Sequence, residues 1–181
     1  MIQAFVFVLV FCMSVVAANA QKAADFSGKW TLDVAKSKLG DRNSIESQTI
    51  TVVQTAADIK IETATKRMAP PAGSPAGPGG GGAGRMGGGG DTPMTYALDG
   101  KETKIERQGP NGSIPVMLKA KAEGSKLWLS QSMTFTTPNG EMTMTTKETW
   151  ELGADGKSLT VTTERTTMGG TDSTTKVFSK G

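Results

Sequence analysis

Histidine is absent from this 181-residue chain, and Cys12 is its only cysteine. Cys12 lies in an N-terminal segment that we expect to be removed, so no Ser-His or Cys-His pair and no zinc-histidine site can form in the remaining chain. A pair of carboxylates could still support hydrolysis. The strand pattern, however, places only Glu148 inside the sheet, with Asp172 nearer its rim. We therefore expect a protein that is not an enzyme and that carries no cofactor and no metal.

Runs of like charge are missing as well. The chain holds 20 Lys and Arg against 17 Asp and Glu, a net charge of +3, and these charges are scattered. A nucleic-acid-binding surface needs its cations gathered on one face, so we expect no nucleic-acid partner. A Gly-x-Gly-x-x-Gly pattern occurs at Gly77, Gly79 and Gly82. A dinucleotide site needs a helix directly after these glycines, and here the pattern predicts a strand.

Residues 1–20 carry no charge, are mostly apolar and end in the small-residue sequence Ala18-Asn19-Ala20. This pattern predicts a secretory signal peptide that is cleaved near Ala20, so that the protein is exported and is either periplasmic or secreted. The lack of Lys or Arg near Met1 departs from the usual signal and leaves open a start upstream. Residues 21–181 then form one domain, with no membrane span in the mature chain.

Apolar residues alternate with polar ones along most of residues 26–180, which predicts about ten β-strands. The first strand covers Phe26 to Leu32, and Asp33 is positioned to cap a short helical segment from Val34 to Leu39. Between the third and fourth strands, residues 68–91 are rich in Gly and Pro. Such a composition has little apolar surface to offset its ordering entropy, so we expect a disordered loop there.

Turn pairs predict how the strands face one another, because side chains alternate between the two faces of a sheet. Asp99-Gly100 predicts a hairpin that pairs Met94–Leu98 with Thr103 and Ile105. The other turns predict these opposed residues: Ala120 with Leu129 for Gly124-Ser125; Leu129 with Trp150, Gln131 with Glu148 and Phe135 with Met144 for Asn139-Gly140; Trp150 with Val161 for Asp155-Gly156; Val161 with Phe178 and Thr163 with Lys176 for Gly169-Gly170. The large apolar residues then share one face, which predicts an all-β, antiparallel up-and-down meander closed as a barrel.

Polar and charged residues interrupt the apolar inward face. Burying a charge costs roughly several kcal/mol unless it is paired or hydrated. Two interpretations stay open: a closed network in which Glu148 bridges Arg165 and Lys176, or a water-filled cavity whose cations meet an anionic ligand. The candidate ligand-binding residues are Tyr96, Gln131, Glu148, Arg165 and Lys176.

The outward face is largely Thr and Ser and is expected to be solvated. Lys147 falls opposite Glu164 there, a favourable cross-strand pair. Trp128 is expected on the same face, beside Lys121 and Glu151. A single exposed aromatic is usually ordinary surface, but it leaves open a protein partner at Trp128.

Two short motifs carry a family resemblance. The first strand contains Phe26-Ser27-Gly28-Lys29-Trp30, and the meander ends in Thr174-Thr175-Lys176-Val177-Phe178. Together they resemble the calycin superfamily, the lipocalins and fatty-acid-binding proteins, and most of all the small exported lipocalin-like proteins of bacteria. The resemblance implies a lipocalin-like β-barrel. The Arg-x-Tyr pair that holds a fatty-acid carboxylate in fatty-acid-binding proteins falls on Lys176 and Phe178, so the charge is kept and the hydroxyl is lost.

These observations lead to one expected function and two competitors. We expect an exported binding barrel for a small amphipathic, anionic ligand. The alternative is a non-catalytic structural or interaction protein with a packed interior. An enzyme of unknown reaction ranks third, since a fold alone does not define an activity.

Overall fold

The computed structural model describes residues 24–40, 44–69, 93–109, 112–137, 140–167 and 169–181. The predicted signal peptide and residues 70–92 of the Gly-rich stretch lie outside the described residues. Ten strands make up most of the described chain: β1 (Gly28–Lys38), β2 (Ile45–Gln54), β3 (Asp58–Arg67), β4 (Met94–Ala97), β5 (Asp99–Gly109), β6 (Gly112–Glu123), β7 (Lys126–Thr137), β8 (Gly140–Leu152), β9 (Ser158–Thr167) and β10 (Gly170–Lys180).

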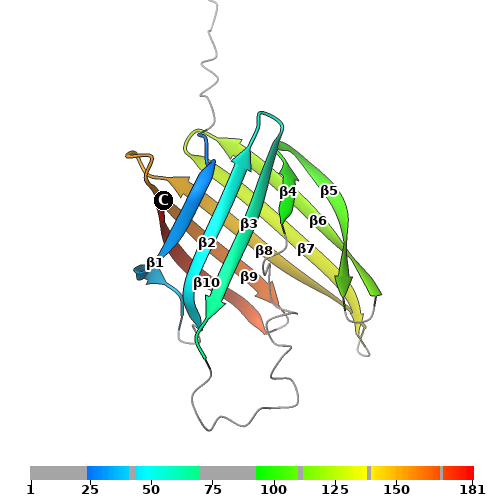
Figure 1. The fold of residues 1–181 in the computed structure, drawn as a ribbon. Coiled ribbons are helices and arrows are strands. Elements are labelled where there is room, and N and C mark those ends of the chain that lie inside the picture. Colours follow the sequence, from blue (N-terminus) through cyan, green and yellow to red (C-terminus); the bar gives the residue numbers. More distant parts are fainter. Residues whose placement is uncertain (1–23, 41–43, 70–92, 110–111, 138–139, 168) are drawn as a thin grey trace, which may run out of the picture.

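All ten strands belong to one antiparallel sheet in the order β4-β3-β2-β1-β10-β9-β8-β7-β6-β5 (Figure 1). The predicted all-β up-and-down meander is thereby confirmed. The sheet curls so that β1–β3 lie across the interior from β6–β9, and the result is a nearly closed barrel. Within the described residues, no helix is long and apolar enough to cross a membrane.

The barrel is not sealed by hydrogen bonds between β4 and β5, which form the two edges of the sheet. The predicted hairpin across Asp99-Gly100 is therefore wrong. β4 pairs with β3 instead, where Tyr96 lies opposite Ile59. Gly100 (φ 77°) lies in a register shift of β5 between Asp99 and Glu102. Glycine tolerates a positive φ, and here this conformation occurs at an irregularity within a strand and not in a hairpin turn.

Two of the predicted turns are centred correctly. Ala120 lies opposite Leu129 across β6 and β7, and Trp150 lies opposite Val161 across β8 and β9. The connection from β8 to β9 is longer than the two residues expected, since Leu152 and Leu159 form its last strand pair. A longer loop with the same centre preserves the register.

The turns placed at Asn139-Gly140 and Gly169-Gly170 are each one residue too late, so the predicted pairings are wrong by two residues. Gly140 lies opposite Thr137, and Gly170 lies opposite Thr167. Each glycine is the first residue of its strand, with φ of 114° and 120°. Because side chains alternate with period two, a shift of two keeps every side chain on its predicted face. The faces are confirmed, whereas the rows within them change.

The predicted helical segment at residues 34–39 is also wrong, because β1 continues to Lys38 with a register shift after Asp33. Asp33 does accept a hydrogen bond from the Lys36 N–H at 3.2 Å, as a helix cap would. Ser37, however, accepts the N–H of Val177 on β10 at 2.9 Å through its hydroxyl. The contact to Asp33 therefore stabilises an irregular strand.

The apolar core draws on both layers of the barrel. Each fully buried large side chain contributes roughly 1.5–3 kcal/mol through the surface it removes from water. The largest of them are Trp30, Trp150, Phe26, Phe178, Ile59, Leu118, Leu127, Leu159 and Val116.

Gln54 holds the segment that precedes β1 against this core through two hydrogen bonds. Its side-chain carbonyl accepts the Phe26 N–H at 2.9 Å, and its amide donates to the carbonyl of Ala24 at 3.0 Å. The indole N–H of Trp30 donates to the carbonyl of Phe26 at 2.8 Å. The buried polar groups around the Phe-x-Gly-x-Trp motif are thus paired, which explains how this segment can lie against the core.

Candidate binding face inside the barrel

The five candidate residues all face the interior, each from a different strand. Their positions are Tyr96 on β4, Gln131 on β7, Glu148 on β8, Arg165 on β9 and Lys176 on β10. Strand alternation explains this placement, because each lies two or four residues along its strand from an inward apolar side chain. Tyr96 belongs to the core cluster, while the other four are only partly buried. Beyond the core, the interior therefore carries polar and charged side chains.

The four partly buried candidates do not form the single row that the turns predicted. Glu148 lies opposite Thr163 as expected, but Gln131 faces Thr146, and Lys176 faces Val161. Arg165 is the residue that faces Thr146 from the other side. The side chains share one face but are staggered along it, so they line a surface rather than a ring.

Glu148 does not bridge the two cations. Its Oε2 accepts the indole N–H of Trp150 at 2.8 Å. Among the described residues, it makes no ion pair within 4.0 Å with Arg165 or Lys176. The structure therefore does not contain the closed network in which Glu148 bridges Arg165 and Lys176. Burial, reinforced by the negative charge of Glu148, raises the pKa of Tyr96 well above its ordinary value, so this phenol stays protonated at neutral pH.

Lys176 has an uncharged partner. Its ammonium donates to Oε1 of Gln48 at 3.0 Å, and the Gln48 amide donates to the hydroxyl of Thr65 at 2.8 Å. These bonds run from β10 to β2 and on to β3. Loss of water around Lys176 lowers its pKa; the charge of Glu148 opposes this shift, and that of Arg67 adds to it. The ammonium is thus held by a neutral carbonyl while its surroundings disfavour its charge.

Arg165 carries an unsatisfied donor. Its Nε is buried and has no hydrogen-bond partner among the described residues. Buried donors are almost always paired, because leaving one unpaired costs about 1–3 kcal/mol. Asp172 lies opposite Arg165 in register but is exposed. Arg165 is therefore the inward cation whose bonding capacity the described chain does not use up.

The sequence-based selection missed three members of this face: Gln48, Arg67 and Arg107. The alternation that places Ile50 inside also places Gln48 inside, and the same step from Ile105 reaches Arg107. Arg107 lies near enough to lower the pKa of Tyr96 against the effects of burial and Glu148. Extending the period-2 pattern to the ends of β2, β3 and β5 would have found all three.

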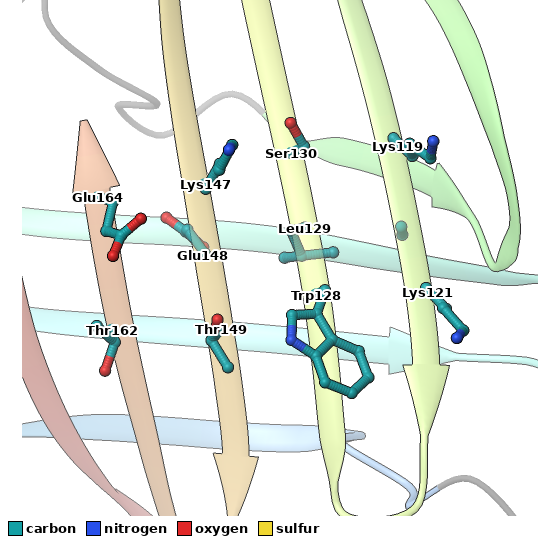
Figure 2. A pocket seen from close by; sticks show the side chains of 11 residues that line it. Lys119, Lys121, Trp128, Leu129, Ser130, Lys147, Glu148, Thr149, Thr162 and Glu164 are labelled. Carbon is teal, nitrogen blue, oxygen red and sulfur yellow. The ribbon is translucent and has the colours of Figure 1, made fainter. Parts of the chain in front are cut away.

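One hollow lies on the outward face of the sheet, opposite to the face that carries the candidate residues (Figure 2). It measures about 240 Å³, and Lys121 of β6, Trp128 of β7 and Lys147 of β8 are among the residues that line it. Trp128 is 38% exposed and lies opposite Lys121, as predicted. Lys147 also faces Glu164 as predicted. No three His, Cys, Asp or Glu side chains in the described part of the chain lie close enough to hold a metal ion.

Comparison with known proteins adds one similar structure. No family model matches the chain. No curated protein matches it either. Among solved structures, the chain is similar to zebrafish ileal bile acid-binding protein complexed with cholic acid, with a TM-score of 0.47 and 16% sequence identity. The match covers 86% of this chain and 98% of the zebrafish chain.

Proposed function

We propose that the protein is an exported, non-catalytic barrel that binds a small amphipathic anion inside, with Arg165 and Lys176 contacting the anionic group. The observation that carries the proposal is the unpaired, buried Nε of Arg165 on an inward face that also holds Lys176. An anion placed between them would accept charge-assisted hydrogen bonds, which are stronger than the neutral bond Lys176 makes to Gln48.

The balance of inward charge supports an anion rather than a cation. Among the partly buried inward residues, Arg107, Arg165 and Lys176 are basic, whereas Glu148 is acidic and already accepts the bond from Trp150. The exposed rim of this face adds one charge of each sign, Arg67 and Asp172. Beyond Gln131, β7 and β8 supply apolar side chains to the same face. These side chains, which are only partly buried, are Met133, Phe135, Met142 and Met144. Cations beside partly exposed apolar groups suit a molecule with a charged head and an apolar body.

Export is part of this proposal. The described fold begins at Ala24, whose N–H donates to the carbonyl of Gly124 at 2.8 Å. Cleavage after Ala20 would leave that bond intact. Mass measurement of the protein from the extracellular and periplasmic fractions of its host should show a chain that begins at Gln21. A chain that retains residues 1–20 in the cytoplasm would contradict it.

One observation favours the second candidate, a structural protein with a closed interior. The bonds from Lys176 to Gln48 and from Gln48 to Thr65 connect strands that are not neighbours in the sheet, since β1 separates β10 from β2. Such a connection ties β10 to β2 and β3 across β1. In that case Lys176 would serve stability, and anion binding would be absent.

Displacement of a dansyl-labelled fatty acid tests the proposal. A charge-assisted bond contributes about 1.5–3 kcal/mol, so Lys176→Met and Arg165→Met should each weaken fatty-acid binding by about 10- to 100-fold. The matched control is Lys147→Met, which removes an outward lysine from the same sheet and should leave the affinity unchanged. The fatty-acid methyl ester should bind wild type and both inward variants alike. No binding by the wild type, or equal loss with Lys147→Met, would contradict the proposal.

A further inference from the structure

Three methionines share the inward face of the β7–β8 hairpin. Met133 lies directly opposite Met144, and Met142 lies opposite Phe135. The turn at Asn139-Gly140 predicted Phe135 opposite Met144, so the corrected register is what brings two methionines face to face. Met133 packs against the core, and all three side chains remain partly exposed.

The spacing of these residues allows their sulfurs to meet. Directly opposed residues have Cβ atoms roughly 4.5–5.5 Å apart. Met142 and Met144 are two residues apart on β8, which separates them by roughly 6.5–7 Å along the strand. A methionine side chain has three rotatable bonds, so three thioethers that start from this triangle can converge on one point.

The surroundings suit a soft, singly charged ion. Val116 lies opposite Met133 on β6, and Phe135 flanks the group on β7. In the described parts of β6 to β9, Glu148 is the inward carboxylate, and it stands four residues from Met144, roughly 13 Å along the strand. Arg165, opposite Thr146, adds positive charge nearby. Hard divalent cations need oxygen ligands, which this group lacks, whereas thioethers select Cu(I).

We propose that Met133, Met142 and Met144 form a site for one Cu(I) ion, and equally for Ag(I), bound through their three thioether sulfurs. The site does not depend on the proposed anion site, because it uses sulfur atoms and not the inward cations. Leucine in place of methionine keeps the apolar lining that an amphiphile would contact while removing the donor atom.

Thioether ligation has a distinctive pH dependence. Cys, His and carboxylate ligands must lose a proton to bind a metal, so such sites release it in acid. A thioether has no proton to lose. Binding of Ag(I) at about pH 4 should therefore match that at about pH 7, within about threefold.

Competition with bicinchoninate for Cu(I) under reducing conditions, and direct titration with Ag(I), test the site. The wild-type chain should bind one ion, and the triple variant Met133→Leu, Met142→Leu, Met144→Leu should bind at least about tenfold more weakly. The matched control is Met117→Leu. Met117 lies opposite Ser132 on the outward face of β6 and is also partly buried. Its replacement should leave the affinity for Cu(I) and Ag(I) unchanged.

Spectra of wild-type protein labelled at the methionine methyl carbons make the test independent of how the variants fold. Addition of Ag(I) should shift the methyl signals of Met133, Met142 and Met144 and leave that of Met117 in place. Absence of competition by the wild type would overturn the proposal. So would equal loss with Met117→Leu, unchanged affinity in the triple variant, or release of the ion at about pH 4.

Discussion

The inward face of the barrel has two regions that arise from the same alternation of side chains. They differ in whether their polar groups have hydrogen-bond partners. Trp30 and Phe26 are fully buried, and the polar groups named above that surround them are paired. Beyond the core, Arg165 keeps an unpaired donor and Lys176 holds a charge that its surroundings disfavour. The first region supplies stability, and the second tolerates imperfect contacts. This difference indicates where a ligand would be accommodated.

Trp150 joins the two regions. Its ring packs edge-on against Phe26 with centroids 6.3 Å apart, while its indole N–H donates to Glu148 on the polar side. A buried indole usually finds a partner for its N–H, and here the partner belongs to the polar region. The orientation of Glu148 is therefore tied to the packing of the core.

The largest expected effect separates the core from the surface. Trp30→Ala removes a fully buried indole and its bond to Phe26, and it should lower the free energy of unfolding by about 3–5 kcal/mol. The matched control is Trp128→Ala, which removes an indole from the outward face and should cost less than about 1 kcal/mol. Urea unfolding of the two variants measures both values. Equal costs would mean that the outward face contributes as much to stability as the core.

Much of the fold could be predicted from the sequence, because period-2 alternation over ten strands leaves little choice of fold class. The predicted face of each side chain is correct even where the predicted register is wrong, as in the strand pairs that begin at Gly140 and Gly170. What the sequence could not show is on which side of a positive-φ glycine a turn lies. It also could not show that Asp99-Gly100 marks an irregularity within β5 rather than a hairpin.

The inward positions of the candidate residues could be predicted, but their contacts could not. The inward position of Glu148, Arg165 and Lys176 follows from alternation alone. Their partners do not, because Lys176 and Gln48 lie 128 residues apart in the chain and meet only through barrel curvature. The pairing of Met133 with Met144 was hidden by the same two-residue shift that moved Lys176 from Thr163 to Val161.

A smaller effect concerns Lys176. At neutral pH, Lys176→Met should change the free energy of unfolding by no more than about 1 kcal/mol, because loss of the bond to Gln48 is opposed by removal of a desolvated charge. A bridging ion pair broken in a closed network would instead cost about 3–5 kcal/mol. Urea unfolding of wild type and variant decides between these values.

The pH dependence of that difference has a defined sign. The pKa of Lys176 in the folded chain is lowered from its ordinary value of 10.5, so the unfolded chain holds the proton more tightly. The stability of the wild type relative to Lys176→Met should therefore rise as the pH increases through the folded pKa toward 10.5. A relative stability that falls over this range would mean that folding favours the charged form of Lys176.

The smallest expected effect lies on the outward face. Lys147 and Glu164 stand opposite each other on β8 and β9, and both are exposed. Exposed pairs are screened by water and lose side-chain entropy when they associate, so a double-mutant cycle with Lys147→Ala and Glu164→Ala should give a coupling below about 0.5 kcal/mol. The coupling should shrink further at about 1 M salt, where the Debye length is about 3 Å. A coupling above about 1 kcal/mol that persists in salt would show that this pair is held rigidly. The outward face would then not be a simple solvated surface, and its contrast with the interior would no longer hold.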